Sequence, residues 1–235
     1  MIKHCFNKAA ATYDEHSDMQ QIIGEQLLLQ LQLIPHQTTR VIDLGCGTGL
    51  TTAKLAKQSQ YTHFCAIDIA DQLLEKAKQR LSPLAIEVKQ MDFQMLVAAN
   101  FDLAFANLTL QWGNLSKSLA SINAALANQG TLAFSIPLHD HFPELMQEGK
   151  NSFLEPTCLI QQLKHAHFNC LHFHEEKRVA SFESARHALQ SIKAVGANYV
   201  FQRSHKALRG KNWLQHFTST LTYHVGYFIA QKKPS

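Results

Sequence analysis

The stretch Val41-Ile42-Asp43-Leu44-Gly45-Cys46-Gly47-Thr48-Gly49 decides the fold of this chain. A short apolar run ends in an aspartate, turns through three glycines spaced two residues apart, and leads directly into a helical segment at residues 50–58. Glycines permit a sharp turn and leave room for a ligand close to the backbone. A helix N-terminus offers free N–H groups to a carboxylate or phosphate. The stretch therefore predicts a strand, a ligand-binding loop and a helix in succession.

Outward from this stretch, strands and helices alternate along the chain. Apolar runs predict strands at residues 41–44, 64–69, 86–88, 103–106, 131–136, 171–182 and 221–230. Helical spacing predicts helices at residues 20–34, 50–58, 71–81, 115–127, 156–167 and 183–195, the fourth of them ended by Gly130. Such alternation predicts a parallel, doubly wound α/β sheet.

The domain organisation follows from the same pattern. The chain has 235 residues, with no internal repeat and no low-complexity linker, so we expect a single domain over residues 1–235. The alternation begins only after residue 35 and is interrupted again before the last strand. We therefore expect residues 1–35 to form N-terminal cap helices and residues 184–217 to form a cap insertion.

The composition indicates a cytoplasmic protein. Hydrophobic residues make up 46% of the chain, which is enough for a sizeable core, yet no apolar run approaches the length of a membrane span. The N-terminus turns polar and acidic too early for a signal peptide. The cysteines are odd in number, scattered and without a Cys-x-x-Cys pair, which favours reduced thiols: Cys5, Cys46, Cys65, Cys158 and Cys170.

Charge is distributed unevenly along the chain. Residues 184–235 contain eight Lys or Arg and no Asp or Glu, whereas residues 1–183 contain 14 basic and 18 acidic residues. The basic quarter could form a face for an anionic partner or could simply be a solvated surface. Both interpretations stay open on charge alone.

The glycine loop resembles that of class I S-adenosylmethionine-dependent methyltransferases. A dinucleotide-binding fingerprint would need glycine at position 50, where this chain has leucine. The spacing here is Gly-x-Gly-x-Gly, and an aspartate precedes it. The resemblance implies a Rossmann-like, mostly parallel seven-stranded sheet whose last strand is antiparallel. It also implies S-adenosylmethionine as cofactor and S-adenosylhomocysteine as product.

The same resemblance implies which residues bind the cofactor. The loop would hold the methionine part, and Asp68, which lies 19 residues after Gly49, would accept hydrogen bonds from the ribose hydroxyls. Asp92 and Phe93 would lie beside the adenine, and Asn107 beside the methyl group. The predicted cofactor-binding residues are Asp43, Gly45, Cys46, Gly47, Gly49, Asp68, Ile69, Asp92, Phe93 and Asn107.

The residues after the fourth strand bear on the acceptor. Enzymes that methylate nucleobase amines place an Asn/Asp-Pro-Pro-aromatic run there, whereas this chain has Asn107-Leu108-Thr109-Leu110-Gln111-Trp112. We therefore expect no nucleic-acid acceptor.

Several further stretches resemble the malonyl-acyl-carrier-protein O-methyltransferases of biotin synthesis. They are FNKAAATYDEHSDMQ (6–20), NLTLQW (107–112), GTLAFSIP (130–137), SIKAVGAN (191–198), LRGKNWL (208–214) and LTYHVGYFIA (221–230). The loop PLHDHFPELMQEG (137–149) departs from the family, because it is rich in histidine and lacks an expected glycine.

The narrower resemblance implies methylation of the free carboxylate of malonyl-acyl carrier protein, which gives the methyl ester that primes biotin (pimeloyl) synthesis. No general base is expected, since a carboxylate with a pKa near ~4 is already ionised. Arg186, Lys193 or Arg203 would hold the carboxylate, with Arg186 favoured for its bidentate guanidinium. Lys206, Arg209 and Lys211 would dock the acidic carrier.

Two aromatic residues complete the predicted substrate site. Tyr13 would close over the reacting groups, or would anchor an N-terminal helix in the core. Trp112 would form a wall of the acceptor pocket, or ordinary core.

Histidine pairs and rival functions complete the predictions. The pairs His139-x-His141, His165-x-His167 and His172-x-His174 lack further ligands at suitable spacing, so we expect no metal. One rival acceptor is another small-molecule carboxylate or a quinone-ring carbon. A second rival is a non-catalytic S-adenosylmethionine-binding or RNA-binding protein, against which the intact loop and sparse aromatics weigh. We expect a monomer.

Overall fold

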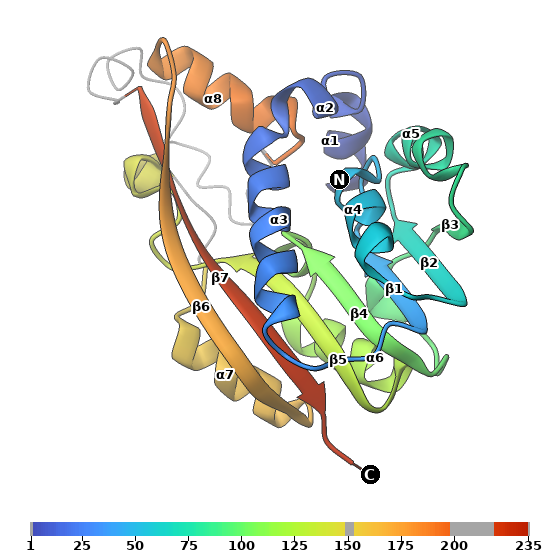
Figure 1. Ribbon diagram of the computed structural model, residues 1–235. Helices are drawn as coiled ribbons and strands as arrows, with labels where there is room; N and C mark the ends of the chain where they lie inside the picture. Colours follow the sequence, from blue (N-terminus) through green and yellow to red (C-terminus); the bar gives the residue numbers. More distant parts are fainter. Residues whose placement is uncertain (1, 149–152, 198–218, 235) are drawn as a thin grey trace.

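The computed structural model describes residues 2–148, 153–197 and 219–234, and within these ranges it contains one seven-stranded sheet (Figure 1). The strands are β1 (Arg40–Leu44), β2 (His63–Asp68), β3 (Ile86–Gln90), β4 (Phe101–Asn107), β5 (Leu126–Pro137), β6 (Phe168–Ser181) and β7 (Thr220–Lys232). The α-helices are α1 (Ile2–Ala9), α2 (Tyr13–His16), α3 (Asp18–Gln32), α4 (Leu50–Gln58), α5 (Asp71–Leu81), α6 (Leu115–Ala125), α7 (Pro156–His165) and α8 (Ala185–Ala194). Three short 3-10 helices join them: η1 (Phe93–Met95), η2 (Leu110–Trp112) and η3 (Pro143–Glu148).

The order of the strands across the sheet is β3-β2-β1-β4-β5-β7-β6. Neighbours from β3 to β5 pair in parallel, whereas β7 is antiparallel to both β5 and β6. The predicted mostly parallel sheet with an antiparallel last strand is therefore confirmed. The chain order reverses between β1 and β4, and in sheets of this kind a ligand binds at that point, beyond the carboxyl ends of the strands.

Helices cover both faces of the sheet. Successive residues of each strand point to opposite faces, so a strand of consecutive apolar residues needs helices on both sides to bury them. On one face, Leu119 of α6 and Leu163 of α7 belong to the same buried cluster as Ile42 of β1. On the other face, Leu27 of α3 and Leu55 of α4 pack in a second buried cluster. Figure 1 shows α3 lying across this second face, with α6 and α7 behind the sheet.

A glycine in α3 allows that helix to approach the sheet closely. A Cβ atom on Gly24 would lie 2.7 Å from Thr51 Oγ1 and 3.0 Å from Asn107 Nδ2. Glycine inside a helix costs about 1 kcal/mol relative to alanine. The close contact also lets Asn107 Nδ2 donate to the carbonyl of Gln20 at 2.9 Å, which ties the N-terminal cap to the end of β4.

One predicted boundary is wrong. The helix predicted at 115–127 ends at Ala125, and Gly130 lies inside β5 instead of terminating the helix. Residues 127–130 form a bulge, since Phe101 pairs with Leu126 while Leu103 pairs with Thr131. Gln129 takes a left-handed φ of 61° there. A bulge of this length leaves no alternating pattern that a strand prediction could detect.

Predictions about the ends of the chain have mixed outcomes. Residues 2–32 contain the helices α1 to α3, and their separation as an N-terminal cap stays a prediction. The predicted insertion at 184–217 includes α8, but its residues from 198 onward lie outside the described ranges. Among the described residues, no helix combines the length and apolar character that crossing a membrane requires. The single domain over 1–235 stays a prediction.

Candidate active site

The glycine loop after β1 is held against the end of β2. The N–H groups of Gly45 and Cys46 both donate to the carbonyl of Ile67, at 2.8 and 2.9 Å. Gly45 and Gly47 have left-handed φ angles of 69° and 57°. A Cβ on Gly45 would collide with Thr109 at 2.5 Å, whereas the nearest atom to a Cβ on Gly47 would be the Tyr13 hydroxyl at 3.7 Å. Gly45 is therefore required for packing, whereas a Cβ at Gly47 would make only ordinary van der Waals contact with the Tyr13 ring.

Asp68 stabilises the loop from the end of β2. One carboxylate oxygen accepts the N–H of Gly47 at 2.9 Å, and the other accepts the N–H of Ala70 at 2.8 Å. Burial raises the pKa of Asp68, and the backbone N–H groups oppose that rise. Each oxygen keeps a second lone pair, so the carboxylate can accept a pair of hydroxyl hydrogen bonds.

Asp43 is the most deeply buried acid of the site, with 3% of its surface exposed. Its carboxylate accepts a hydrogen bond from Thr52 Oγ1 at 2.6 Å. Burial raises the pKa of Asp43 to about 7; the nearby Asp68 adds to the rise and the Thr52 hydroxyl opposes it. A cation beside this carboxyl would stabilise its charged form.

A small cavity lies between the glycine loop and the N-terminal cap. Most of the residues that line it have polar side chains. The lining residues are Tyr13, Ser17, Gln20, Gln21, Asp43, Gly45, Cys46, Thr48, Leu50, Thr51 and Asn107. Gln20 Oε1 is buried there and has no hydrogen-bond partner among the described residues. An unpaired buried acceptor beside a buried carboxyl favours a ligand that donates hydrogen bonds.

Three residues that line this cavity were not predicted from the sequence: Ser17, Gln20 and Gln21. The three residues lie at the start of α3 with spacings of three and four, so they share one side of the first helical turn. Gln21 Nε2 donates to Ser17 Oγ at 3.3 Å. The polar spacing was visible in the sequence, but no pattern there shows that this turn faces the loop after β1.

Tyr13 and Asp14 join the cap to the glycine loop. Burial, with a contribution from nearby Asp68, raises the pKa of Tyr13, so its phenol keeps its proton at neutral pH. Asp14 accepts hydrogen bonds from Thr48 Oγ1 at 2.6 Å and from Arg80 at 2.8 Å. Burial would raise the pKa of Asp14, but these hydrogen bonds hold it below its usual value. The cap is thus fixed over the loop by a partly buried ion pair.

Three other predicted cofactor residues have neighbours that constrain them. Asp92 caps η1, accepting the N–H of Gln94 at 2.9 Å. Phe93 is only 8% exposed and packs in the main core. Asn107 lines the cavity, and its Oδ1 accepts a hydrogen bond from Ser135 Oγ at 2.7 Å.

The side chain of Cys46 packs under the glycine loop. It lies in a small buried cluster with Leu74 and Ala77. Burial raises the pKa of its thiol well above the ordinary value, so the group stays protonated. Ile69 lies next to Asp68, and its carbonyl accepts a hydrogen bond from Gln90 at 3.1 Å.

Tyr13 is the one predicted substrate residue of the described ranges that lines the cavity. Trp112 packs edge-on against Phe6 of α1, with ring centroids 5.4 Å apart, and its Nε1 donates to the Leu108 carbonyl at 3.2 Å. Arg186 and Lys193 are exposed on α8, and neither belongs to the cavity lining found in the described ranges. Four other predicted residues lie outside the described residues: Arg203, Lys206, Arg209 and Lys211.

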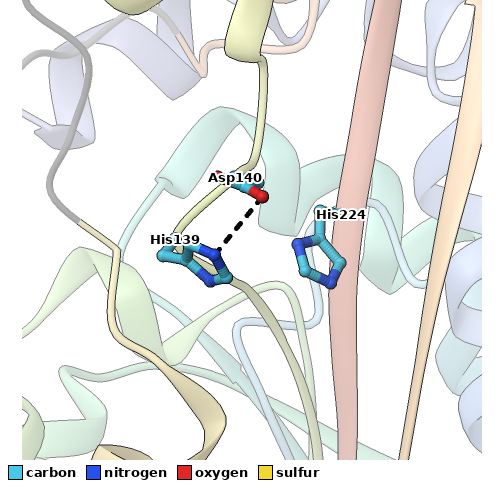
Figure 2. Close-up of side chains that lie close together, drawn as sticks. All are labelled: His139, Asp140 and His224. Atoms are coloured by element: carbon cyan, nitrogen blue, oxygen red, sulfur yellow. Dashed lines mark ion pairs between the residues drawn. The ribbon is translucent and has the colours of Figure 1, made fainter.

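The histidine-rich loop after β5 differs from the expectation of no metal ligands. His139 and Asp140 lie beside His224 of β7, with the potential ligand atoms all within 4.8 Å of one another (Figure 2). His141, the second member of the predicted pair, points elsewhere and donates from Nδ1 to the carbonyl of His224 at 3.0 Å. Sequence spacing could not find this cluster, because His224 lies 84 residues after Asp140 and meets it only through the pairing of β5 with β7.

Comparisons with known proteins identify this chain as a methyltransferase, in agreement with the sheet topology and the glycine loop. The family model "Methyltransferase domain" matches residues 35–204. A malonyl-[acyl-carrier protein] O-methyltransferase of Coxiella burnetii is 37% identical over 98% of this chain and 95% of its own length. The chain belongs to the malonyl-[acyl-carrier protein] O-methyltransferase family. The methyltransferase identity predicted from the glycine loop is thereby confirmed, as is the narrower family.

Other relatives and solved structures extend this result. The biotin biosynthesis bifunctional protein BioHC of Cellvibrio japonicus is 31% identical over 92% of this chain, which corresponds to 45% of that longer protein. The YcgJ protein of Bacillus subtilis has a TM-score of 0.65 at 11% identity, covering 90% of this chain and 99% of its own. A SAM-dependent methyltransferase of Thermotoga maritima has a TM-score of 0.62 at 14% identity, covering 99% and 100%. These two structures share the fold.

Proposed function

We propose that this protein transfers a methyl group from S-adenosylmethionine to the free carboxylate of a malonyl group carried on acyl carrier protein. The products would be the malonyl methyl ester, which primes biotin synthesis, and S-adenosylhomocysteine. The observation that carries the proposal is the 37% identity to a malonyl-[acyl-carrier protein] O-methyltransferase over nearly the whole chain.

The cavity fits S-adenosylmethionine in its charge and its hydrogen-bonding groups. The ligand carries an ammonium, for which Gln20 Oε1 is an unpaired acceptor and Asp43 a buried carboxyl. The methionine part would lie beside the loop residues Gly45 and Cys46, which line the cavity, while Gly47 and Gly49 would shape the turn through their left-handed φ angles. When bound, S-adenosylmethionine supplies a methyl group attached to positively charged sulfur.

The remaining cofactor contacts follow the carboxyl edge of the sheet. Asp68, with Ile69 beside it, would accept hydrogen bonds from the two ribose hydroxyls. Asp92 would accept a hydrogen bond from the adenine amino group, and Phe93 would pack against the adenine ring. Asp68 is already oriented by two backbone N–H groups, so it would lose little freedom on binding.

The acceptor requires positioning and no proton transfer. A malonyl carboxylate with a pKa near ~4 is ionised at neutral pH and acts directly as the nucleophile. Tyr13 keeps its proton and would donate a hydrogen bond near the reacting groups while the cap excludes water. Hydrogen bonds to Gln20 and Ser135 hold the side chain of Asn107 in place, and this side chain would lie beside the transferred methyl group.

The basic C-terminal quarter would recognise the acidic carrier. Lys206, Arg209 and Lys211 remain our choice for docking, and Arg186, Lys193 or Arg203 for holding the carboxylate. Because Arg186 and Lys193 are exposed, the second role requires the carrier-bound acceptor to pass α8. We place the enzyme in the cytoplasm, as a monomer.

Product analysis tests this function. Malonyl-acyl carrier protein incubated with the enzyme and S-adenosylmethionine should gain one methyl group on the malonyl carboxylate, as read by mass spectrometry of the acyl chain. With both substrates saturating and chemistry limiting, turnover should show no base titration near neutral pH. A product methylated on carbon or nitrogen would contradict the proposal and would favour a different acceptor.

A further inference from the structure

A cluster of three potential metal ligands lies beyond the carboxyl end of β5, apart from the cavity at the glycine loop. His139 and Asp140 come from the loop that follows β5, and His224 comes from β7 (Figure 2). The N–H of Leu138 donates to the carbonyl of His224 at 3.0 Å, so the backbone fixes the loop beside the strand. None of the three belongs to the cavity lining described above.

The spacing of the ligand atoms suits a small divalent cation. Zinc binds imidazole nitrogen and carboxylate oxygen at about 2.0–2.2 Å, so two ligand atoms in a tetrahedral site lie about 3.4 Å apart. His139 Nε2 lies 3.3 Å from Asp140 Oδ2. All three ligand atoms lie within 4.8 Å of one another, so small side-chain rotations would complete the site.

Each histidine also has a carboxylate on its other ring nitrogen. His139 Nδ1 lies 3.1 Å from Glu155 Oε2, and His224 Nε2 lies 3.5 Å from Glu175 Oε2. A carboxylate that accepts the second N–H of a metal-bound histidine usually orients the ring, and these two carboxylates lie close enough for small side-chain rotations to make such hydrogen bonds. Glu155 and Glu175 therefore fit a supporting shell around the cluster.

His224 leaves a ring nitrogen unsatisfied. Its side chain is about 95% buried, with only 5% of the residue exposed, and its Nδ1 has no hydrogen-bond partner within the described ranges. Figure 2 shows the His224 ring facing His139 and Asp140. A buried polar atom without a partner destabilises the fold, and a metal ion bound at Nδ1 would supply the missing partner.

The charges around the cluster also match a divalent cation. Among the described residues, the ion pairs of the cluster join three carboxylates, those of Asp140, Glu155 and Glu175, and the ammonium of Lys177, a formal sum of −2.

We propose that His139, Asp140 and His224 form a binding site for a divalent transition-metal ion of the zinc class, with Glu155 and Glu175 orienting the two histidines. Three protein ligands leave a further coordination position for water. The ion would join the loop after β5 to β7. Because none of its ligands lines the cavity at the glycine loop, the site would be separate from methyl transfer. The imidazole donors favour zinc, nickel or copper over magnesium and calcium.

Lys177 is the residue that opposes binding. Its Nζ lies 3.3 Å from Asp140 Oδ2, the same oxygen that faces His139. The side chain is 53% exposed, so it can swing into solvent when a cation enters. Removal of this ammonium in Lys177→Gln should therefore tighten metal binding, which a merely structural ion pair would not predict.

Metal titration of the full-length, chelator-treated protein tests the proposal. We expect one equivalent of Zn²⁺ to bind by calorimetry with micromolar or tighter affinity, and Co²⁺ to give the visible absorption of a site with nitrogen and oxygen ligands. His139→Ala and Asp140→Asn, both at partly exposed positions, should weaken binding about 100-fold. Glu155→Gln should weaken it about 10-fold. Lys177→Gln should strengthen it, and the exposed control His165→Ala should leave it unchanged.

Absence of stoichiometric Zn²⁺ binding to the wild-type chain would overturn the proposal. Binding that His139→Ala and Asp140→Asn leave unchanged, or that His165→Ala reduces as much as they do, would assign the metal to scattered surface histidines. Circular dichroism of each variant separates loss of the site from loss of the fold.

Discussion

The glycine loop and the histidine cluster lie at the same edge of the sheet, yet they are built differently. At the loop, the polar groups have protein partners, since Asp68 accepts two backbone N–H groups and Asp43 accepts the Thr52 hydroxyl. At the cluster, the ligand atoms are side chains, and His224 Nδ1 lacks a partner among the described residues. The loop is thus shaped by the fold itself, whereas the cluster depends on three side chains. Substitutions should therefore separate the two regions.

The largest effect is expected at the border of the loop. Gly47→Val should weaken S-adenosylmethionine binding at least about 100-fold, or about 2.8 kcal/mol, because the side chain fills the space beside Tyr13. A left-handed φ costs a non-glycine residue about 1–2 kcal/mol, which the fold should survive. Calorimetry measures the affinity. Unchanged affinity in a folded variant would refute the assignment of the loop.

Gly45→Ala is the matched contrast for that experiment. Its Cβ would lie 2.5 Å from the Thr109 side chain, so the variant should lose about 1–3 kcal/mol of unfolding free energy through overpacking. Urea denaturation measures this loss. Zn²⁺ binding by Gly47→Val should equal that of the wild type, since the histidine cluster shares no residue with the loop.

The next largest effect is expected at Asp68. Asp68→Ala should reduce cofactor affinity by about 1.5–3 kcal/mol, since charged acceptors of hydroxyl hydrogen bonds contribute about that much. Part of the loss comes from the N–H of Gly47, which also loses its partner. Asp68→Asn, which retains an acceptor oxygen, should lose less when the two are compared by equilibrium binding. Equal affinities for Asp68→Ala and the wild type would remove this residue from the site.

A pH dependence should distinguish the buried carboxyl of Asp43. Its pKa of about 7 means that a cationic ligand must displace a proton at lower pH. Apparent S-adenosylmethionine affinity should therefore fall about tenfold from pH 8 to pH 6 and level off above pH 8. Asp43→Asn should abolish the slope. Calorimetry in buffers of different ionisation enthalpy should detect the released proton, and its absence would contradict the prediction.

The smallest effect is expected in the basic C-terminal quarter. Lys206→Glu combined with Arg209→Glu should raise the KM for carrier-bound malonate several-fold at low salt while leaving cofactor affinity unchanged. The effect should shrink at physiological salt, where screening acts over about 8 Å. Lys57→Glu, an exposed reversal on α4, is the control. Equal KM values for all three proteins at low salt would make the quarter a solvated surface.

Much of the fold could be predicted because its signals are local. The bounds of α4 and α5 agree with the predicted helices, and the seven strands lie where apolar runs indicated. The bulge at 127–130 could not be predicted, since it results from pairing with β4 and has no periodicity of its own.

The candidate site was less predictable, because it depends on which surfaces meet. The glycine loop and Asp68 follow from spacing along two adjacent strands. Gln20 does not, since its place in the cavity depends on how α3 crosses the sheet. The same limit applies to His224, which reaches His139 only because β7 inserts beside β5.

Transfer of a labelled methyl group tests the central claim most directly. The enzyme should move label from S-adenosylmethionine to malonyl-acyl carrier protein, in a linkage that alkali releases as methanol, and should act less efficiently on malonyl-coenzyme A. Gly47→Val should abolish the transfer, whereas Asp140→Asn should retain it. Absence of label on the malonyl carboxylate, or label in an alkali-stable linkage, would contradict the account.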